Sequence, residues 1–156
     1  VDNHTFISHN VARCESNEMF KYVLNDQSVG AFAGKVLVKE NCPRTVAYQG
    51  NRNIVASADA KMYSKPQLEI YTDDVKCSHG SATGQLNEEA LFYMRSRGIS
   101  EAEARQLLMQ AFMSDVIDAV RLPALKDRLH HLVEKRFRGQ LAMCADCTAA
   151  NCAVAK

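Results

Sequence analysis

The segment from Lys65 to Leu86 contains the pair of residues with the clearest chemical potential, Cys77 and His79. Apolar and polar residues alternate before the pair, as in a β-strand, and this period of two continues through it. In an extended segment both side chains lie on one face, with Cα atoms about 7 Å apart, so both can reach one ion. A thiol and an imidazole suit soft or borderline metals. A buried thiol beside a hydrogen-bonded histidine, with no metal, explains the pair equally well.

Two ligands alone do not hold a metal ion well, because stable transition-metal sites usually have four. Gly80 follows the pair and would allow another backbone to approach closely. The sequence therefore predicts half of a site, which a partner would complete.

A glycine-rich stretch, Gly30 to Val36, is one residue too short between its glycines for a phosphate-binding loop. It also lacks the Ser or Thr after Lys35 that would hold magnesium. We therefore expect that this chain does not bind ATP. No Ser-His-Asp, HExxH or EF-hand spacing is present either, so the sequence does not indicate a stand-alone hydrolase.

Three cysteines lie near the C-terminus, Cys144, Cys147 and Cys152. The first two have the Cys-x-x-Cys spacing of zinc or redox sites, but no histidine lies nearby to complete four ligands. Two explanations of these cysteines stay open. They are incidental thiols in a flexible tail, or they contact a metal or cluster together with another chain. His130 and His131 are adjacent in a predicted helix and point about 100° apart, which indicates surface or packing roles.

The chain has 156 residues, six cysteines and a net charge of +1. Neither half is a charged arm, and no apolar stretch has the length of a membrane span or the character of a signal peptide. We expect a cytoplasmic protein with reduced thiols and without a nucleic-acid or membrane partner. The chain starts without Met, and we expect it to be a fragment.

Short apolar runs separated by polar turns extend to about residue 86 and predict an all-β unit. A barrel, a sandwich and a β-helix all fit this pattern. The expected strands are residues 5–7, 19–24, 29–33, 35–38, 45–48, 54–56 and 68–71. The expected turns are Asn25–Asp26, residues 41–43, residues 50–53 and Asp59.

From Asn87 onward the apolar period changes to 3.6, which predicts helices. Asn87 can cap a first helix that ends at Gly98, and Ser100 with Glu103 forms a capping box for a second. A third helix follows Pro123, ends at Gly139, and carries an apolar stripe of Leu125, Leu129, Leu132, Val133 and Phe137. We expect a strand domain at residues 1–86, a helical domain at 87–140 and a flexible, cysteine-containing tail at 141–156.

The sequence resembles the SUF iron–sulfur cluster assembly proteins, in particular the SufD branch of the SufB/SufD family. The matching segments cover nearly the whole chain, and the Cys-Ser-His-Gly motif at residues 77–80 is typical of that branch. The segments are Cys14–Lys21, Gly30–Val38, Gln49–Asn53, Lys65–Tyr71, Asp73–Gly80, Gly84–Leu86 and Glu89–Ile99.

The resemblance implies a mainly β plus α fold, with rungs of a right-handed parallel β-helix followed by a C-terminal helical domain. It also implies that the chain is the C-terminal portion of a longer, non-catalytic scaffold subunit of the SufBCD complex. That subunit would pair with SufB through the end of the β-helix and bind the SufC ATPase through the helices. His79 would be a ligand of iron or of the nascent Fe–S cluster, shared with SufB, and Cys77 its neighbour or co-ligand.

Three alternatives stay open. A second copy of the chain, as a homodimer, or another chain could cover the open rung expected at residue 1. The chain could be a pure interaction module in which Cys77 and His79 only pack an interface. It could also be a metal-dependent enzyme that uses the pair with a carboxylate such as Asp73.

Overall fold

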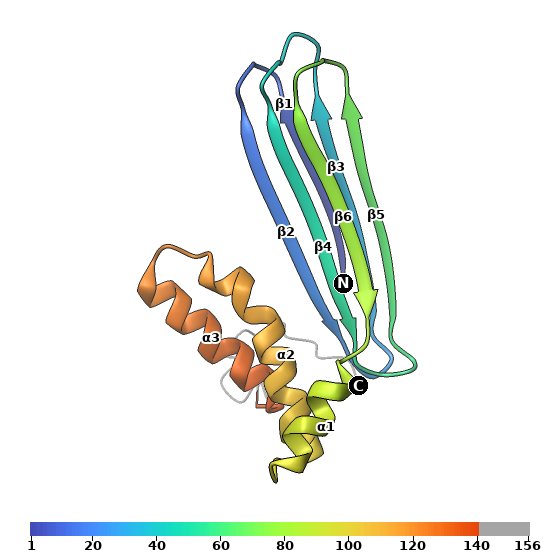
Figure 1. Ribbon diagram of the computed structural model, residues 1–156, viewed down its shortest axis with the longest axis vertical. Coiled ribbons are helices and arrows are strands. Elements are labelled where there is room, and N and C mark those ends of the chain that lie inside the picture. The colour runs from blue at the N-terminus through green and yellow to red at the C-terminus, as the bar shows by residue number, and fades with distance from the viewer. Residues whose placement is uncertain (141–156) are drawn as a thin grey trace, which may run out of the picture. The chain divides into compact units, whose positions relative to one another are not determined.

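The computed structural model describes residues 1–140, in which six strands precede three helices (Figure 1). Residues 1–93 form one compact unit, and the described residues from 94 onward belong to a second. The strands are β1 (Asp2–His9), β2 (Glu15–Leu24), β3 (Val29–Val38), β4 (Val46–Val55), β5 (Lys61–Ile70) and β6 (Lys76–Gly84). The helices are α1 (Glu88–Ser96), α2 (Glu101–Asp118) and α3 (Pro123–Phe137).

The six strands form two parallel, three-stranded sheets with the orders β1-β3-β5 and β2-β4-β6. Successive strands therefore alternate between the sheets, and β1 to β4 each pair with the strand two places further along the chain. Asp2 pairs with Ala31, an offset of 29 residues, and Val29 pairs with Lys61, an offset of 32. The expected combination of β-structure with C-terminal helices is confirmed at this level.

The corners between strands are stacked as well. Arg13, Arg44 and Asp74 all have left-handed backbone angles, with φ of 62°, 61° and 57°. The amide of Arg13 donates to the carbonyl of Pro43 at 3.0 Å, and that of Arg44 donates to the carbonyl of Asp74 at 2.6 Å. Equivalent corners about 30 residues apart thus satisfy each other's backbone groups, which helps to keep successive strand pairs in register.

Two breaks that the sequence predicts between strands do not exist. Residues 50–53, expected to be a turn, lie inside β4, and the separate strands expected at 29–33 and 35–38 are one strand, β3. The misleading signals are Gly34, Gly50, Asn51 and Asn53, which are typical of turns. Here Asn51 and Asn53 are buried and point between the sheets, where side chains from other strands satisfy their amides.

The space between the two sheets contains an apolar cluster beside a polar network. Tyr22, Leu24, Phe32 and Ala60 form the hydrophobic cluster, and the rings of Phe20 and Phe32 lie 4.9 Å apart. The network consists of hydrogen-bonded polar side chains: Gln49, Asn51, Asn53, Ser64, Ser81 and Thr83. Because Phe20 pairs with Asn51 and Tyr22 with Asn53, the two groups lie at the same level along β2 and β4. Buried polar side chains are generally hydrogen-bonded in this way.

The helix termini lie close to where the sequence predicts them. The Ser100 hydroxyl accepts from the Glu103 amide at 3.3 Å at the start of α2. Gly98 and Gly139, with φ of 86° and 73°, follow α1 and α3. In the second unit, the Gln106 side chain of α2 donates a hydrogen bond to the carbonyl of Phe137 at 3.0 Å. This bond connects α2 to the end of α3.

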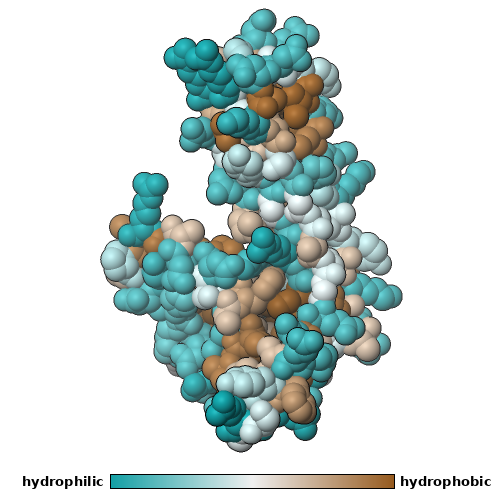
Figure 2. All heavy atoms as spheres, viewed as in Figure 1, coloured by the Kyte–Doolittle hydropathy of each residue, from teal (hydrophilic) through white to brown (hydrophobic). Residues whose placement is uncertain are grey.

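The apolar stripe expected on α3 is incompletely covered. No residue of α3 is buried, and Leu125 and Leu132 are 43% and 37% exposed. Figure 2 shows hydrophobic surface among hydrophilic residues in the part of the molecule that contains the helices. Among residues 1–140, no helix is both long enough and apolar enough to cross a membrane. The expected tail at 141–156, with Cys144, Cys147 and Cys152, lies outside the described residues.

Candidate functional site

Cys77 and His79 both lie on β6, and their positions in the strand place them on one face. They pair in register with Ala47 and Gln49 of β4, which are both buried between the sheets. The Cys77 and His79 side chains therefore belong to the inward face of their sheet. Cys77 is half-buried, whereas His79 is exposed.

The exposure of His79 follows from the place of β6 in the fold. β6 is the last strand of the sheet β2-β4-β6, and within residues 1–140 no strand pairs with its other edge. Every residue of β6 after Cys77 is exposed. The inward-facing row that includes the candidate ligands is thus open to solvent along an unpaired strand edge, which is a template for pairing with another chain.

Burial raises the pKa of the Cys77 thiol above its ordinary value, and a hydrogen bond with the backbone of Ala47 offsets part of that rise. The thiol is therefore protonated at neutral pH, while the thiolate is the form that binds metals and attacks electrophiles. A metal ion bound here has to displace that proton.

His79 is in register with two residues that the sequence analysis missed, Gln49 of β4 and Glu18 of β2. Gln49 is 3% exposed, and its Nε2 donates to Glu18 Oε2 at 2.7 Å. The polar residues Gln49, Asn51 and Asn53 alternate with exposed or half-buried residues along β4. That period of two was the available signal, but the glycine and asparagines within it are also typical of a turn.

The other candidate residues are spread over the molecule. Asp73, the carboxylate considered for a metal-dependent enzyme, is exposed before β6. Within residues 1–140, no three His, Cys, Asp or Glu side chains are grouped as a metal site. Of the remaining histidines, His9 Nε2 lies 2.9 Å from Ser16 Oγ, and His130 Nε2 lies 3.2 Å from Asp118 Oδ1.

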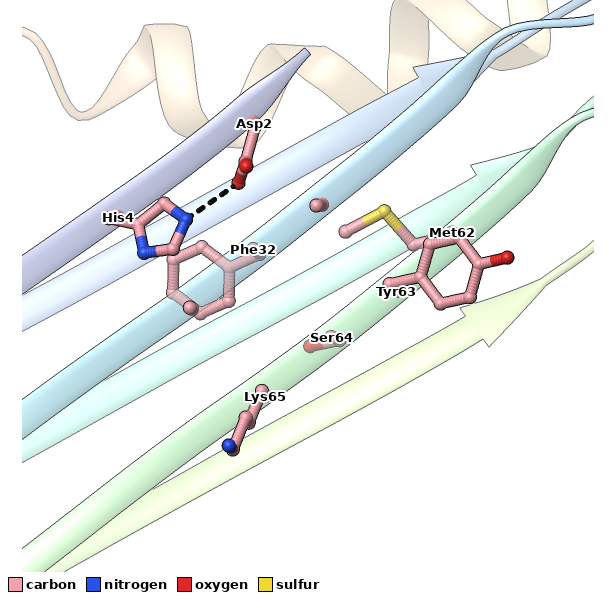
Figure 3. Close-up of a pocket in the computed structure, with 9 residues that line it drawn as sticks. Asp2, His4, Phe32, Met62, Tyr63, Ser64 and Lys65 are labelled. Atoms are coloured by element: carbon pink, nitrogen blue, oxygen red, sulfur yellow. Dashed lines mark ion pairs between the residues drawn. The ribbon is translucent and has the colours of Figure 1, made fainter.

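A groove of about 620 Å³ lies on the sheet β1-β3-β5, floored in part by Ala31 and Ala33 of the central strand (Figure 3). Asp2 and His4 line it from β1 and form an ion pair at 3.0 Å, and Tyr63 and Lys65 line it from β5. The small side chains of β3 between larger ones on both neighbours create the hollow. Cys77 and His79 do not line it.

A comparison with protein families identifies the family of this chain. The sequence model described as "SUF system FeS cluster assembly, SufBD core domain" matches residues 1–112. The chain belongs to the SufBD family. The SufBD match includes all six strands and the Cys77–His79 pair, and it confirms the resemblance to the SUF assembly proteins.

Individual SufBD proteins show the same relationship. The iron–sulfur cluster assembly protein SufD of Escherichia coli is 36% identical over 138 residues, which cover 88% of this chain and 33% of that protein. An iron–sulfur cluster assembly SufBD family protein of Synechocystis is 39% identical over 135 residues, covering 86% of this chain and 30% of its own length. The chain thus spans about a third of the length of these relatives.

Proposed function

We propose that the chain is the scaffold portion of a SUF iron–sulfur cluster assembly complex, without enzymatic activity of its own. The family match over residues 1–112 is the observation that carries this proposal. The names of its relatives refer to cluster assembly. A cytoplasmic location stays a prediction from cysteine usage.

The strand unit would form the last rungs of a right-handed parallel β-helix. Parallel pairing of alternate strands at offsets of 29 to 32 residues supports this, because one rung would then contain two long strands. In this proposal residues 1–86 form the β-helix end, and the unpaired edge of β6 pairs with SufB. Strand addition at an exposed edge provides main-chain hydrogen bonds to a partner.

His79 and Cys77 would contact the cargo of the complex, which is iron or a nascent Fe–S cluster. Their common face, the exposure of His79 and the open edge of β6 support this role. Imidazole and thiolate are suitable ligands for iron, and SufB would supply the remaining ones. The raised pKa of Cys77 favours His79 as the first ligand, because a neutral imidazole binds without losing a thiol proton.

The helical domain, residues 87–140, would bind the SufC ATPase, and ATP hydrolysis would belong to SufC. The incompletely covered stripe on α3 supports a docking role, since Leu125 and Leu132 remain exposed. Basic residues beside the stripe, Lys135, Arg136 and Arg138, would add charged contacts at its C-terminal end. A homodimer, a pure interaction module and an enzyme that uses Cys77 and His79 are the other hypotheses.

Anaerobic reconstitution with iron and sulfide tests the ligand role in the full-length protein bound to SufB. We expect the cluster absorbance to fall severalfold in His79→Ala while the complex stays intact by size-exclusion chromatography. His4→Ala is the matched control, because His4 is an exposed histidine in the same unit that pairs with Asp2. Unchanged absorbance in His79→Ala would contradict the ligand role and favour the interaction module, and turnover of a small molecule by the protein alone would favour the enzyme.

A further inference from the structure

One row of side chains crosses the sheet β2-β4-β6 and ends at His79. Glu18, Gln49 and His79 occupy neighbouring positions on β2, β4 and β6. Neighbouring strands lie about 4.8 Å apart, so side chains in one row are within reach of each other. The row connects the exposed histidine to a buried amide and, beyond it, to a carboxylate.

The orientation of the Gln49 amide is determined by Glu18. Its Nε2 donates to Glu18 Oε2 at 2.7 Å, and the opposite orientation would place two acceptor oxygens against each other. The carbonyl oxygen Oε1 is therefore directed away from β2. It is buried and has no hydrogen-bond partner among the described residues, although buried polar atoms are usually satisfied.

The surroundings of Gln49 leave few donors for this oxygen. From the opposite sheet, Gly34 lies so close that a Cβ there would overlap Gln49 Nε2 and lie 2.6 Å from Phe32 Cζ. Along β4, Ala47 has no polar side chain, and one N–H of Asn51 Nδ2 donates to Asn53 Oδ1 at 3.0 Å. In the row itself, His79 is the described neighbour that has an N–H to offer.

The ring of His79 is free to take this role. No hydrogen bond to its ring is present within residues 1–140, and the side chain is exposed. Rotation of the exposed ring about its side-chain bonds can therefore direct one nitrogen toward β4 without displacing a packed neighbour.

We propose that Gln49 is the positioning residue for His79: its Oε1 accepts a hydrogen bond from one ring N–H, and Glu18 holds the amide in the orientation that permits this. The bond fixes the tautomer of the neutral imidazole and leaves the lone pair of the other nitrogen for an external ligand. Histidines that bind metals usually donate their second N–H to such an oxygen. The proposed bond between His79 and Gln49 is argued only from the positions of Glu18, Gln49 and His79. Its use in metal binding rests on the proposed function.

The tautomer of His79 is measured by long-range ¹H–¹⁵N NMR of the full chain with ¹⁵N-labelled histidine, at about pH 8, where an ordinary imidazole is neutral. We expect one dominant tautomer in the unchanged chain. In Gln49→Leu, which keeps the volume and removes the acceptor, we expect the tautomer ratio to fall by about fivefold, as loss of one net hydrogen bond predicts. Glu18→Leu should lower the ratio less, because the amide can then turn.

Ser81→Ala is the matched control. Ser81 lies two residues from His79 on the same face and bonds to Ser64 and Asn51, not to Gln49. This variant disturbs the polar interior but should leave the tautomer ratio unchanged. An unchanged ratio in both Gln49→Leu and Glu18→Leu would overturn the proposal, as would an equal fall in Ser81→Ala.

Binding of Co²⁺ to the SufB-bound, full-length protein separates this inference from the proposed function. We expect His79→Ala to abolish binding at this site and Gln49→Leu to weaken it by about 10- to 100-fold. Loss in His79→Ala with unchanged affinity in Gln49→Leu would contradict the positioning role and leave the ligand role intact. Unchanged affinity in His79→Ala would contradict the ligand role. The tautomer measurement would then test the hydrogen bond between His79 and Gln49 independently of metal binding.

Discussion

Cys77 and His79 lie two residues apart on one strand face but differ in their contact with solvent. The half-buried thiol lies beside the backbone of Ala47, which is fully buried, whereas the imidazole is exposed on the strand at the sheet edge. Burial disfavours the charged thiolate, so its pKa is raised. At the residue scale, metal binding by Cys77 would therefore require loss of a thiol proton that burial retains.

The raised pKa of Cys77 predicts slow alkylation. Because the thiolate is the reactive form, the rate with iodoacetamide should rise with pH around a midpoint above that of an unfolded peptide of residues 73–80. Mass spectrometry of proteolytic fragments resolves this cysteine from the others. A midpoint equal to or below that of the peptide would contradict the prediction.

The same shift predicts how stability depends on pH. A raised folded-state pKa means that the folded chain retains the thiol proton more strongly than the unfolded chain. This contribution is fully present below the unfolded pKa and is lost as pH rises through the folded pKa. Stability should therefore fall in this alkaline range, and Cys77→Ala should remove that part of the pH dependence in urea unfolding curves.

At the scale of single elements, β4 depends on its buried asparagines. Asn51 Oδ1 accepts from Asn53 Nδ2 at 2.8 Å, from Ser64 Oγ at 2.8 Å and from Ser81 Oγ at 3.3 Å. One side chain thus connects β4 to β5 and β6. A strand whose inward side chains are polar is stable only when side chains of other strands form hydrogen bonds with them.

Asn51→Ala should destabilise the strand unit by about 2 kcal/mol, because it leaves the buried Asn53 amide and the Ser64 hydroxyl short of partners. Urea unfolding followed by far-UV circular dichroism measures this. Thr83→Val is the control, because Thr83 is exposed on β6 and accepts a hydrogen bond from Asn53 Nδ2 at 3.0 Å. Its cost should be below about 1 kcal/mol. Equal effects of the two substitutions would show that Asn51 does not organise the network.

At the scale of the whole molecule, the chain consists of a strand unit and a helical unit, to which we assign different partners. The strand unit has an open sheet edge and the candidate ligands. The helical unit has an α3 stripe that its own packing leaves exposed. Binding of SufB and of SufC should therefore be separable by mutation.

Leu132→Asp should reduce capture of SufC by at least about tenfold, because it places a charge in the apolar stripe, and should leave SufB binding unchanged. Pull-down of both partners by the full-length protein measures the two effects together. Val11→Asp is the control: Val11 is 63% exposed at a corner of the strand unit. Equal SufC capture by the Leu132→Asp variant and the unchanged protein would contradict docking through α3.

The sequence by itself determined the features that depend on local chemistry. The cap at Ser100, the glycines after α1 and α3, and the turn at Asn25–Asp26 lie where their residue types predict, because each forms within a few residues of chain. The matching segments between Cys14 and Ile99 together were sufficient to indicate the SufBD family, and period two placed Cys77 and His79 on one face of a strand.

The tertiary structure decided what depends on pairing between distant residues. Residues 50–53 form a strand and not a turn because Asn51 and Asn53 find partners on β5 and β6. Parallel pairing and the row of Glu18, Gln49 and His79 depend on offsets of about 30 residues, which short-range periodicity does not reveal. For the same reason, only the fold shows that His79 lies at the unpaired edge of a sheet, next to a buried amide oxygen.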